Sequence, residues 1–309
     1  MDTRHPGKPS SQLTWANVGF AFCFIALDAV ISRAFQLRLE ASIISAAIRC
    51  IAQLALVALI LRKVFEADDP WAVAAIAVLL NLMGTLEIVL NKARRRYRHM
   101  FAYVLFSNLA STIPVAIIGI RFAMSEETFW KPSQYIPVVG MLCGNTISGI
   151  VVVVNFILEE LHENKDKVET YLAFGASRLE ACKPIATEGL RLALTPTVST
   201  MSVLGIVSIP GMMTGAILGG ASVEQAARLQ MVIMFMIAAS TALASIAATM
   251  LTLSVVIDAE HRVRMEQIDD RRHAVWRARN AAISKVAEGL RAASRGVASW
   301  VFVLQSRFA

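Results

Sequence analysis

The sequence predicts an all-α, polytopic membrane protein with about seven transmembrane helices. Hydrophobic residues make up 56% of the 309 residues, and the mean hydropathy is +0.57. Soluble domains contain a smaller apolar share. The apolar residues are also concentrated in segments that approach or exceed the roughly 20 residues needed to cross the hydrocarbon of a bilayer.

Seven such segments follow one another along the chain. In order, they are residues 15–31, 41–61, 70–90, 101–120, 135–158, 193–218 and 229–257. Short polar connections separate the first four, and a longer connection, 159–192, lies between the fifth and the sixth. We therefore expect residues 1–257 to form one membrane domain and residues 258–309 to form a separate tail.

Lysine and arginine in the connections predict the orientation of the spans. With the N-terminus outside, the long connection and the tail lie in the cytosol, together with a basic cluster of Lys92, Arg94, Arg95, Arg96 and Arg98. The segments left outside carry fewer basic residues. The net charge of +7 is thus a topology signal. Its dispersal over several connections argues against a nucleic-acid partner.

The cysteines and the first residues exclude several classes of protein. Cys23, Cys50 and Cys143 fall in or beside spans and Cys182 falls in an inside connection, so no pair resembles an extracellular disulfide. There is no Cys-x-x-Cys or His-rich spacing, which leaves any metal site unknown. The first fourteen residues are polar and predict no cleavable signal peptide.

The tail changes composition along its length. Residues 258–280 are mostly polar and predict a solvated helix. Beyond them, apolar residues recur at helical spacing beside basic ones: Ile283, Val286, Leu290, Ala293, Val297, Trp300 and Leu304. Such a stripe suits a helix on the anionic cytosolic leaflet. A coiled-coil surface and a helix packed back on its own domain are the alternatives.

The connection 159–192 has a helical pattern of its own. One side can hold Val168, Tyr171, Leu172, Leu179 and Cys182, while Gly175 interrupts the helix and Pro184 is expected to stop it. The residues around the glycine are small: Ala173, Ala176 and Ser177. A rigid cytosolic knob of this kind suits docking in another protein's groove. The alternative is a plain hairpin between two spans.

Glycine and proline mark two spans as bendable or closely packed. Gly140 and Gly144 are four residues apart, as are Gly211 and Gly215, a spacing that permits close helix crossing in lipid. Pro210 removes a backbone donor inside an apolar run, so its freed carbonyl must face protein or a water-lined cavity. We read Pro210 and Gly211 as a hinge or pathway element, with a passive kink as the alternative.

Polar side chains within spans are costly and are therefore candidates for the transport path. They are Asp28, Arg49, Gln53, Asn81, Glu87, Asn108, Asn145, Thr146 and Asn155. Asn145 is the preferred pathway residue, because it lies near mid-span beside Gly144, whereas Asp28 and Arg49 are expected to neutralise each other. Met201, Met212 and Met213 offer thioethers to a soft metal, although packing is the simpler role of methionine.

These motifs resemble a known family. The cytosolic residues Glu169, Ala173, Gly175, Ala176 and Ser177, followed by Pro184, resemble the coupling loop of ABC-transporter permeases. The spans G-M-L-C-G-N-T-I-S-G (140–149) and G-I-V-S-I-P-G-M-M-T-G-A-I-L-G-G (205–220) are similar to those of the FetB-like permeases. That family includes a bacterial iron-export permease and plant aluminium-sensitivity permeases. The resemblance covers residues 15–257 and leaves out the tail.

The resemblance implies a permease. Within it, we expect the hinge or pathway residues to be Gly140, Gly144, Asn145, Gly149, Pro210, Gly211, Met212, Met213 and Gly215. It also implies a homodimer with two separate ATPase subunits. The chain itself has no G-x-x-x-x-G-K-[ST] phosphate loop, so we expect no enzyme activity and no cofactor in it, with ATP and Mg²⁺ held by the partner. Iron as the exported cargo comes from the resemblance alone. The alternatives are a non-transporting scaffold and an ion-gradient-driven carrier.

Overall fold

The computed structural model describes residues 14–37, 39–67, 69–97, 99–128, 130–257 and 268–269. Within these residues the chain is mostly helical, and its helices form two compact units that divide between Asp68 and Asp69. Each unit is described by itself.

The first unit is a pair of helices, α1 (Trp15–Ala34) and α2 (Glu40–Ala67). Most of their side chains are exposed, and Ala29 and Ser32 are the residues of α1 that are buried. The expected pairing of Asp28 with Arg49 is wrong: both side chains are exposed, and no ion pair joins them in the described part of the chain.

The second unit begins with two apolar helices whose ends widen into π-helix. Asp69 caps α3 (Pro70–Glu87) by accepting a hydrogen bond from the Trp71 N–H, and Pro70 opens the helix, where its missing donor costs nothing. The π-helix η1 (Ile88–Lys92) follows α3 directly. In the same way, η2 (Gly119–Ala123) follows α4 (Met100–Ile118).

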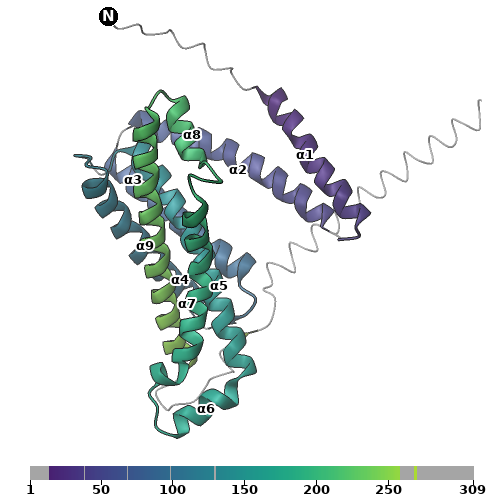
Figure 1. The fold of residues 1–309 in the computed structure, drawn as a ribbon, viewed down its shortest axis with the longest axis vertical. Helices are drawn as coiled ribbons and strands as arrows, with labels where there is room; N and C mark the ends of the chain where they lie inside the picture. Colours follow the sequence, from purple (N-terminus) through teal and green to yellow (C-terminus); the bar gives the residue numbers. More distant parts are fainter. Residues whose placement is uncertain are drawn as a thin grey trace, which may run out of the picture. The chain divides into compact units, whose positions relative to one another are not determined.

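Three long helices form the centre of this unit: α5 (Pro132–Glu163), α7 (Arg178–Val203) and α9 (Val223–Val256). They pack against one another pairwise, and α4 packs on both α5 and α9. The short α6 (Lys165–Ala173) lies at one end of this bundle and α8 (Gly211–Leu218) at the other (Figure 1). The main apolar core lies toward the end of the bundle that carries α6, where Ile157, Leu158 and Leu161 of α5 are fully buried.

Six of the described helical segments are long and apolar enough to cross a membrane. They are Trp15–Ala34, Ser42–Glu66, Pro70–Lys92, Met100–Ala123, Pro132–Glu163 and Val223–Val256. The continuous span expected at 193–218 is not formed. The chain instead leaves the helix after Val203 and resumes it at Gly211. The apolar run is therefore divided between the second half of α7 and α8.

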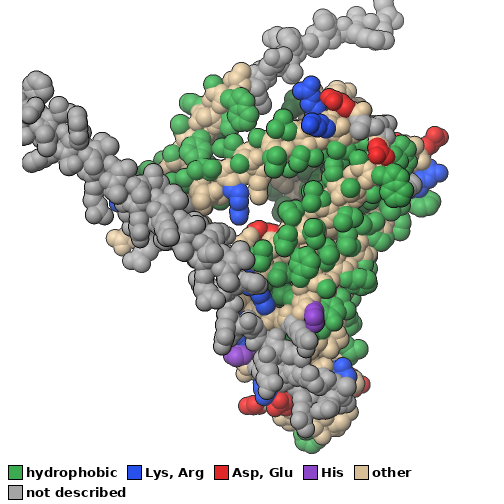
Figure 2. All heavy atoms as spheres, turned by 180° about the vertical axis from the view of Figure 1, so that it is seen from behind, with side chains coloured by type: hydrophobic (Ala, Val, Ile, Leu, Met, Phe, Trp, Pro, Cys, Tyr) green, Lys and Arg blue, Asp and Glu red, His purple; other side chains and the backbone are tan. Residues whose placement is uncertain are grey.

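The surface agrees with a membrane location. Large apolar side chains are exposed along the spans, among them Phe106 on α4 and Phe235 on α9. Figure 2 shows hydrophobic side chains over much of one face, with charged side chains mainly toward its ends. A surface of this kind is stable against lipid rather than water, so the chain is a multi-pass membrane protein.

The tail returns to the basic connection between α3 and α4. Strand β1 (Arg96–Tyr97) pairs antiparallel with β2 (Ile268–Asp269), with Arg96 opposite Asp269. These two tail residues are therefore strand, whereas the sequence predicted helix over 258–280. The rest of that predicted helix and the stripe from Ile283 to Leu304 lie outside the described residues.

The same connection contacts α5 through several groups, among them the amide of Asn155. Asn155 accepts a hydrogen bond from the Arg94 N–H at 3.0 Å and donates one to the Lys92 carbonyl at 3.3 Å. Arg94 Nη1 also lies 3.6 Å from Glu159 Oε2, which forms an ion pair with α5. Asn155, predicted only as a costly polar residue in a span, thus holds the basic connection in place.

Candidate functional site

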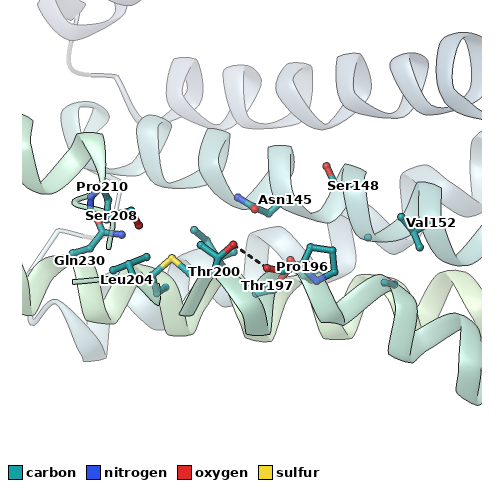
Figure 3. A pocket seen from close by; sticks show the side chains of 15 residues that line it. Asn145, Ser148, Val152, Pro196, Thr197, Thr200, Leu204, Ser208, Pro210 and Gln230 are labelled. Carbon is teal, nitrogen blue, oxygen red and sulfur yellow. Dashed lines mark hydrogen bonds between the residues drawn. The ribbon is translucent and has the colours of Figure 1, made fainter. Parts of the chain in front are cut away.

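A cavity of about 380 Å³ lies between α5, α7 and α9, next to the break in the predicted sixth span. Figure 3 shows Asn145 on α5 facing Pro196, Thr197 and Thr200 on α7, with Gln230 and Pro210 near one another. The lining residues are mostly small or polar: Asn145, Ser148, Gly149, Val152, Ala193, Pro196, Thr197, Thr200, Leu204, Ser208, Pro210, Gln230, Met234, Ile237 and Thr241.

The break that borders the cavity has a local cause. Gly205 takes a φ of +86°, a left-handed conformation that suits glycine, and its N–H donates to the Ser208 carbonyl at 2.9 Å. Pro210 then caps α8 in an extended conformation, with its carbonyl accepting from the Thr214 N–H. The apolar run is interrupted at residues 204–210, directly before Gly211, which begins α8. Its role in transport stays a prediction.

Asn145 lies on the cavity wall, and its predicted place on the transport path stays a prediction. Its Nδ2 donates to the Met141 carbonyl of its own helix at 2.9 Å. Ser148, one turn further along, likewise donates to the Gly144 carbonyl at 3.3 Å. One of the two N–H donors of the Asn145 amide is therefore used by its own helix, and the second N–H and Oδ1 remain for hydrogen bonding.

The α9 wall supplies two polar residues that the sequence reasoning missed. Gln230 and Thr241 line the cavity and are 6% and 1% exposed. Gln230 Oε1 and Thr241 Oγ1 have no hydrogen-bond partner among the described residues. A usable signal was present in the sequence, because these two polar positions in an apolar span are about three turns apart and share one face of the helix.

The cavity unites three of the predicted pathway residues: Asn145, Gly149 and Pro210. The other predicted residues lie elsewhere. Gly140 and Gly144 are on α5 outside the cavity lining, and α8 carries Gly211, Met212, Met213 and Gly215, none of which lines it. Met201 is in α7 and is also absent from the lining.

The expected close helix crossings at the paired glycines are not found within the described chain. A Cβ added to Gly140, Gly144, Gly211 or Gly215 would meet no atom within 4 Å. Close approaches occur at other glycines. A Cβ on Gly149 would lie 2.8 Å from Ser245 Oγ and from Thr241 Cγ2 of α9, and one on Gly84 would lie 2.7 Å from Ile147 Cδ1 of α5.

Several other polar residues of the spans form a buried clamp between α3, α4 and α5. Asn108 Oδ1 accepts from the Thr146 hydroxyl at 2.7 Å, and Asn81 Oδ1 accepts from the Thr112 hydroxyl at 2.8 Å. The Asn108 amide also donates to Cys143 Sγ at 3.4 Å. All are buried, so these side chains satisfy one another and join the helices.

The predicted coupling loop forms an exposed helix–turn–helix at the far end from the break. Helix α6 ends at Ala173, and Gly175 turns the chain with a φ of +88°. Ser177 then caps α7: its N–H donates to Glu180 Oε2 at 2.8 Å, and its Oγ accepts from the Glu180 N–H at 3.4 Å. The Ser177 N–H, which donates to the carboxylate, is the main cause that holds the pKa of Glu180 below its ordinary value, and the Ser177 side chain lowers it further. Ala176 stands between the turn and this cap.

Two expectations about this loop need correction. Pro184 does not stop a helix but lies inside α7, which begins at Arg178, because the capping box at Ser177 starts the helix before the proline is reached. The predicted apolar side is also divided. Val168, Leu172 and Cys182 are buried, whereas Tyr171 and Leu179 are exposed. Burial raises the pKa of the Cys182 thiol to about 11.

The tip of the loop exposes an aromatic residue that the sequence reasoning did not select. Phe174 is 88% exposed and stands in the turn between Ala173 and Gly175. Glu169, one of the predicted contact residues, is half-exposed and pairs with Lys165 one turn earlier at 3.3 Å. The loop thus presents an apolar tip beside charged side chains.

No group of three or more His, Cys, Asp or Glu side chains in the described part of the chain is arranged to hold a metal ion. The cavity offers amide and hydroxyl groups and the thioether of Met234 instead.

Comparison with known proteins shows the family of the chain. The sequence model of an uncharacterised protein family, UPF0014, matches residues 15–257. A UPF0014 membrane protein of Synechocystis sp. is 30% identical over 240 residues, which covers 77% of this chain and 92% of that protein.

Two further relatives have more specific names. The probable iron export permease protein FetB of Escherichia coli is 27% identical over 259 residues, covering 84% of this chain and 98% of its own. The ALUMINUM SENSITIVE 3 protein of Arabidopsis thaliana is 27% identical over 232 residues, covering 75% of this chain and 83% of its own. No solved structure matches the chain. Because the family match spans all the described helices, this multi-pass membrane protein belongs to the UPF0014 family.

Proposed function

We propose that the chain is the permease subunit of an ATP-driven transporter, with its N-terminus outside, its C-terminus in the cytosol and ATP hydrolysed by a separate subunit. The observation that carries the proposal is the exposed α6–α7 turn, which is joined by a single helix to the wall of a cavity that includes amide and hydroxyl side chains in its lining. A permease driven by another protein needs both a contact for that protein and a mechanical link to the solute.

The contact surface has the composition of a docking site. Phe174, Tyr171 and Leu179 are exposed beside one another in sequence around the small residues Gly175 and Ala176. Aromatic anchors dominate the energetics of protein interfaces, and small neighbours let the partner's backbone approach. The interior side of the loop packs on the core through Val168 and Leu172, so this surface is held firmly.

Helix α7 links this surface to the cavity. It starts at the Ser177 cap and continues without interruption to Val203, next to the break. Pro196, Thr197 and Thr200 on its second half line the cavity. A rotation imposed at the turn therefore moves the cavity wall, because a helix transmits displacement along its axis better than a loop does. Two permease chains and two ATPase chains complete the transporter that we propose.

The cargo is proposed by relationship. The E. coli relative is named a probable iron export permease, so we propose export of iron or a related small solute. The Asn145 side chain, on the cavity wall, is the predicted contact on the path.

The test uses Phe174→Ala in the full chain, purified with its candidate ATPase and placed in vesicles. We expect loss of ATPase stimulation and of ATP-dependent transport, with normal insertion. Phe122→Ala is the matched control. Phe122 is also exposed (75%), but it lies in η2, at the end of α4 opposite the α3–α4 connection.

Two results would contradict the proposal. One is normal ATPase stimulation by the Phe174→Ala chain, which removes the docking role. The other is transport that survives ATP depletion while an ion gradient remains, which identifies a gradient-driven carrier. Partner binding without transport of any tested cargo would favour a scaffold.

A further inference from the structure

The break between α7 and α8 leaves part of its backbone without partners. Ile206, Val207 and Ile209 are 88%, 80% and 67% exposed, and their carbonyls accept no backbone hydrogen bond from a described residue. The Ile209 N–H donates none to a described backbone carbonyl. An unpaired peptide group costs little where water bonds it and several times more where water is absent. The surroundings of this segment therefore decide what it requires.

The break lies within the thickness of the membrane. A Cβ on Gly189 of α7 would lie 3.3 Å from Val153 Cγ2 and 3.6 Å from Ile157 Cγ1 of α5. Gly189 therefore stands level with Asn155, which bonds the basic connection. We expect those positive charges at the level of the lipid phosphates. Beyond Gly189, α7 continues for about 21 Å and ends at Val203, short of the far side of a hydrocarbon layer about 30 Å thick.

Lipid alone does not stabilise such a segment. Hydrocarbon supplies no hydrogen bonds, so irregular backbone at this depth is stable only where protein buries it or where it lines a water-filled cavity. Water suits one side of the break, where Ser208 and Pro210 line the cavity. The other side carries Ile206 and Val207, whose large apolar side chains favour contact with protein over contact with water.

We propose that a second copy of this chain covers residues 206–209 within the membrane. The inference rests on the proposed function, which includes two permease chains. The ATPase is not the occupant, because its proposed contact is the α6–α7 turn at the other end of α7. A two-fold contact uses the same patch on both copies. This patch suits such a contact, since it combines apolar side chains with unpaired backbone acceptors and the unpaired Ile209 N–H.

The contact places the second copy directly behind the cavity wall. Leu204, Ser208 and Pro210 line the cavity, whereas Ile206 and Val207, which lie between them in sequence, form the contact. The break is thus shared between the cavity and the interface. A change in the spacing of the two copies therefore changes the shape of the cavity.

Photocross-linking identifies what covers the break. The full chain carries Val207→Cys together with Cys23→Ala and Cys50→Ala, which remove the exposed native thiols, and a benzophenone maleimide labels the introduced cysteine. Isotope-labelled and unlabelled chains are mixed and placed in vesicles at a high lipid-to-protein ratio. After illumination, mass spectrometry separates links between two chains, links within one chain and lipid adducts.

Phe106→Cys in the same background is the matched control. Phe106 is 62% exposed on α4, a continuous helix that packs on α3, α5 and α9. We expect mostly lipid adducts at this position, and mostly links between two chains at Val207. Because a two-fold contact is symmetric, the linked peptide of the second copy should come from residues 204–218.

Three results overturn the inference: mostly lipid adducts at Val207, mostly links within one chain, or an equal share of links between chains at Val207 and Phe106. Links within one chain would show that another part of the same chain covers the break. Thermal unfolding of each labelled variant shows that it is folded, so that lost links are not the result of denaturation.

Cross-linking requires no ATPase, so the two proposals fail separately. Links between chains at Val207 together with an ATPase that ignores Phe174→Ala would retain the interface and reject the coupling role. Lipid adducts at Val207 with normal ATPase dependence on Phe174 would do the opposite.

Discussion

Gly149 allows α5 and α9 to touch at the base of the cavity. Its missing side chain leaves room for Ser245 Oγ and Thr241 Cγ2, each 2.8 Å from where a Cβ would stand. We expect Gly149→Ala to destabilise the protein by about 1–3 kcal/mol, because the added methyl forces the two helices apart. Thermal unfolding in detergent measures this change.

Gly144, on the same helix, is the control for that substitution. A Cβ there meets nothing within 4 Å, so Gly144→Ala should be neutral or raise stability by up to about 1 kcal/mol through helix propensity. Equal destabilisation by both variants would show that the α5–α9 contact is not what makes Gly149 necessary.

Asn145 is the second residue whose role can be separated from folding. Its Nδ2 bonds its own helix, and the side chain faces the cavity rather than the core. Asn145→Leu should lower transport in vesicles while expression and unfolding temperature stay normal. Asn108→Leu is the contrasting variant, because the buried bonds of Asn108 to Thr146 and Cys143 would be lost and folding yield should fall. The reverse pattern would assign the two asparagines to the opposite roles.

At the scale of elements, the start of α7 depends on a charge. The Ser177 N–H donates to Glu180, and the pKa of Glu180 is lowered from 4.5 as a result. A lowered pKa in the folded state means that this stabilisation is complete above pH 4.5 and is lost as the pH falls through the folded value. Hydrogen exchange at the first amides of α7, corrected for intrinsic rates, should therefore accelerate only below about pH 4.5.

Glu180→Gln provides the control for this titration. Glutamine keeps an acceptor for the Ser177 N–H but carries no ionisable group. Exchange in that variant should show no step in this pH range. A step of equal size would assign the titration to another carboxylate.

The elements also show what could be predicted from the sequence. Six of the seven predicted spans coincide with helical segments, since long apolar runs determine such helices directly. The expected break lies close to Pro210, but the helix ends after Val203 at the left-handed Gly205, and Pro210 caps the helix that resumes. Pro184 was wrongly predicted to stop a helix. The prediction used the proline alone, whereas the cap at Ser177 begins α7 before the proline and the helix continues past it.

The site was harder to predict than its helices. Asn145 was selected because it is a polar residue among glycines. Gln230 and Thr241 were missed because their importance depends on which face of α9 meets α5 and α7, and this is decided by packing between distant segments. The tight glycines were misplaced for the same reason. Spacing of four residues identifies a helix face but not the neighbour that covers it.

For the whole molecule, the tail can be divided into two parts with different roles. Strand β2 pairs with the connection between α3 and α4, whereas the apolar stripe from Ile283 onward is predicted to bind the cytosolic leaflet. A chain ending after Asp269 should keep normal exchange at Arg96 and Tyr97. A chain ending after Ile257 should lose this protection, and both should keep ATPase stimulation.

A peptide of residues 282–309 tests the membrane role of the stripe. It should become helical on anionic vesicles, and its binding should weaken with salt, since each basic residue near such a surface contributes about 1 kcal/mol. Circular dichroism and vesicle sedimentation measure both effects. Loss of ATPase recruitment in the chain ending after Asp269 would instead make the stripe a docking element.

The length of α5 affects how far from the membrane surface the proposed ATPase would bind at the α6–α7 turn. Its 32 residues extend for about 48 Å, whereas the hydrocarbon of a bilayer is only about 30 Å thick. Asn155 contacts the basic connection, which we expect to lie at the level of the lipid phosphates because its charges are positive. Helix α5 continues beyond Asn155 to Glu163, a further distance of about 12 Å. This exceeds the screening length of roughly 8 Å in physiological salt. We therefore expect screening to reduce the field of the lipid headgroups strongly at α6, so that recruitment of a partner there differs little between neutral and acidic membranes.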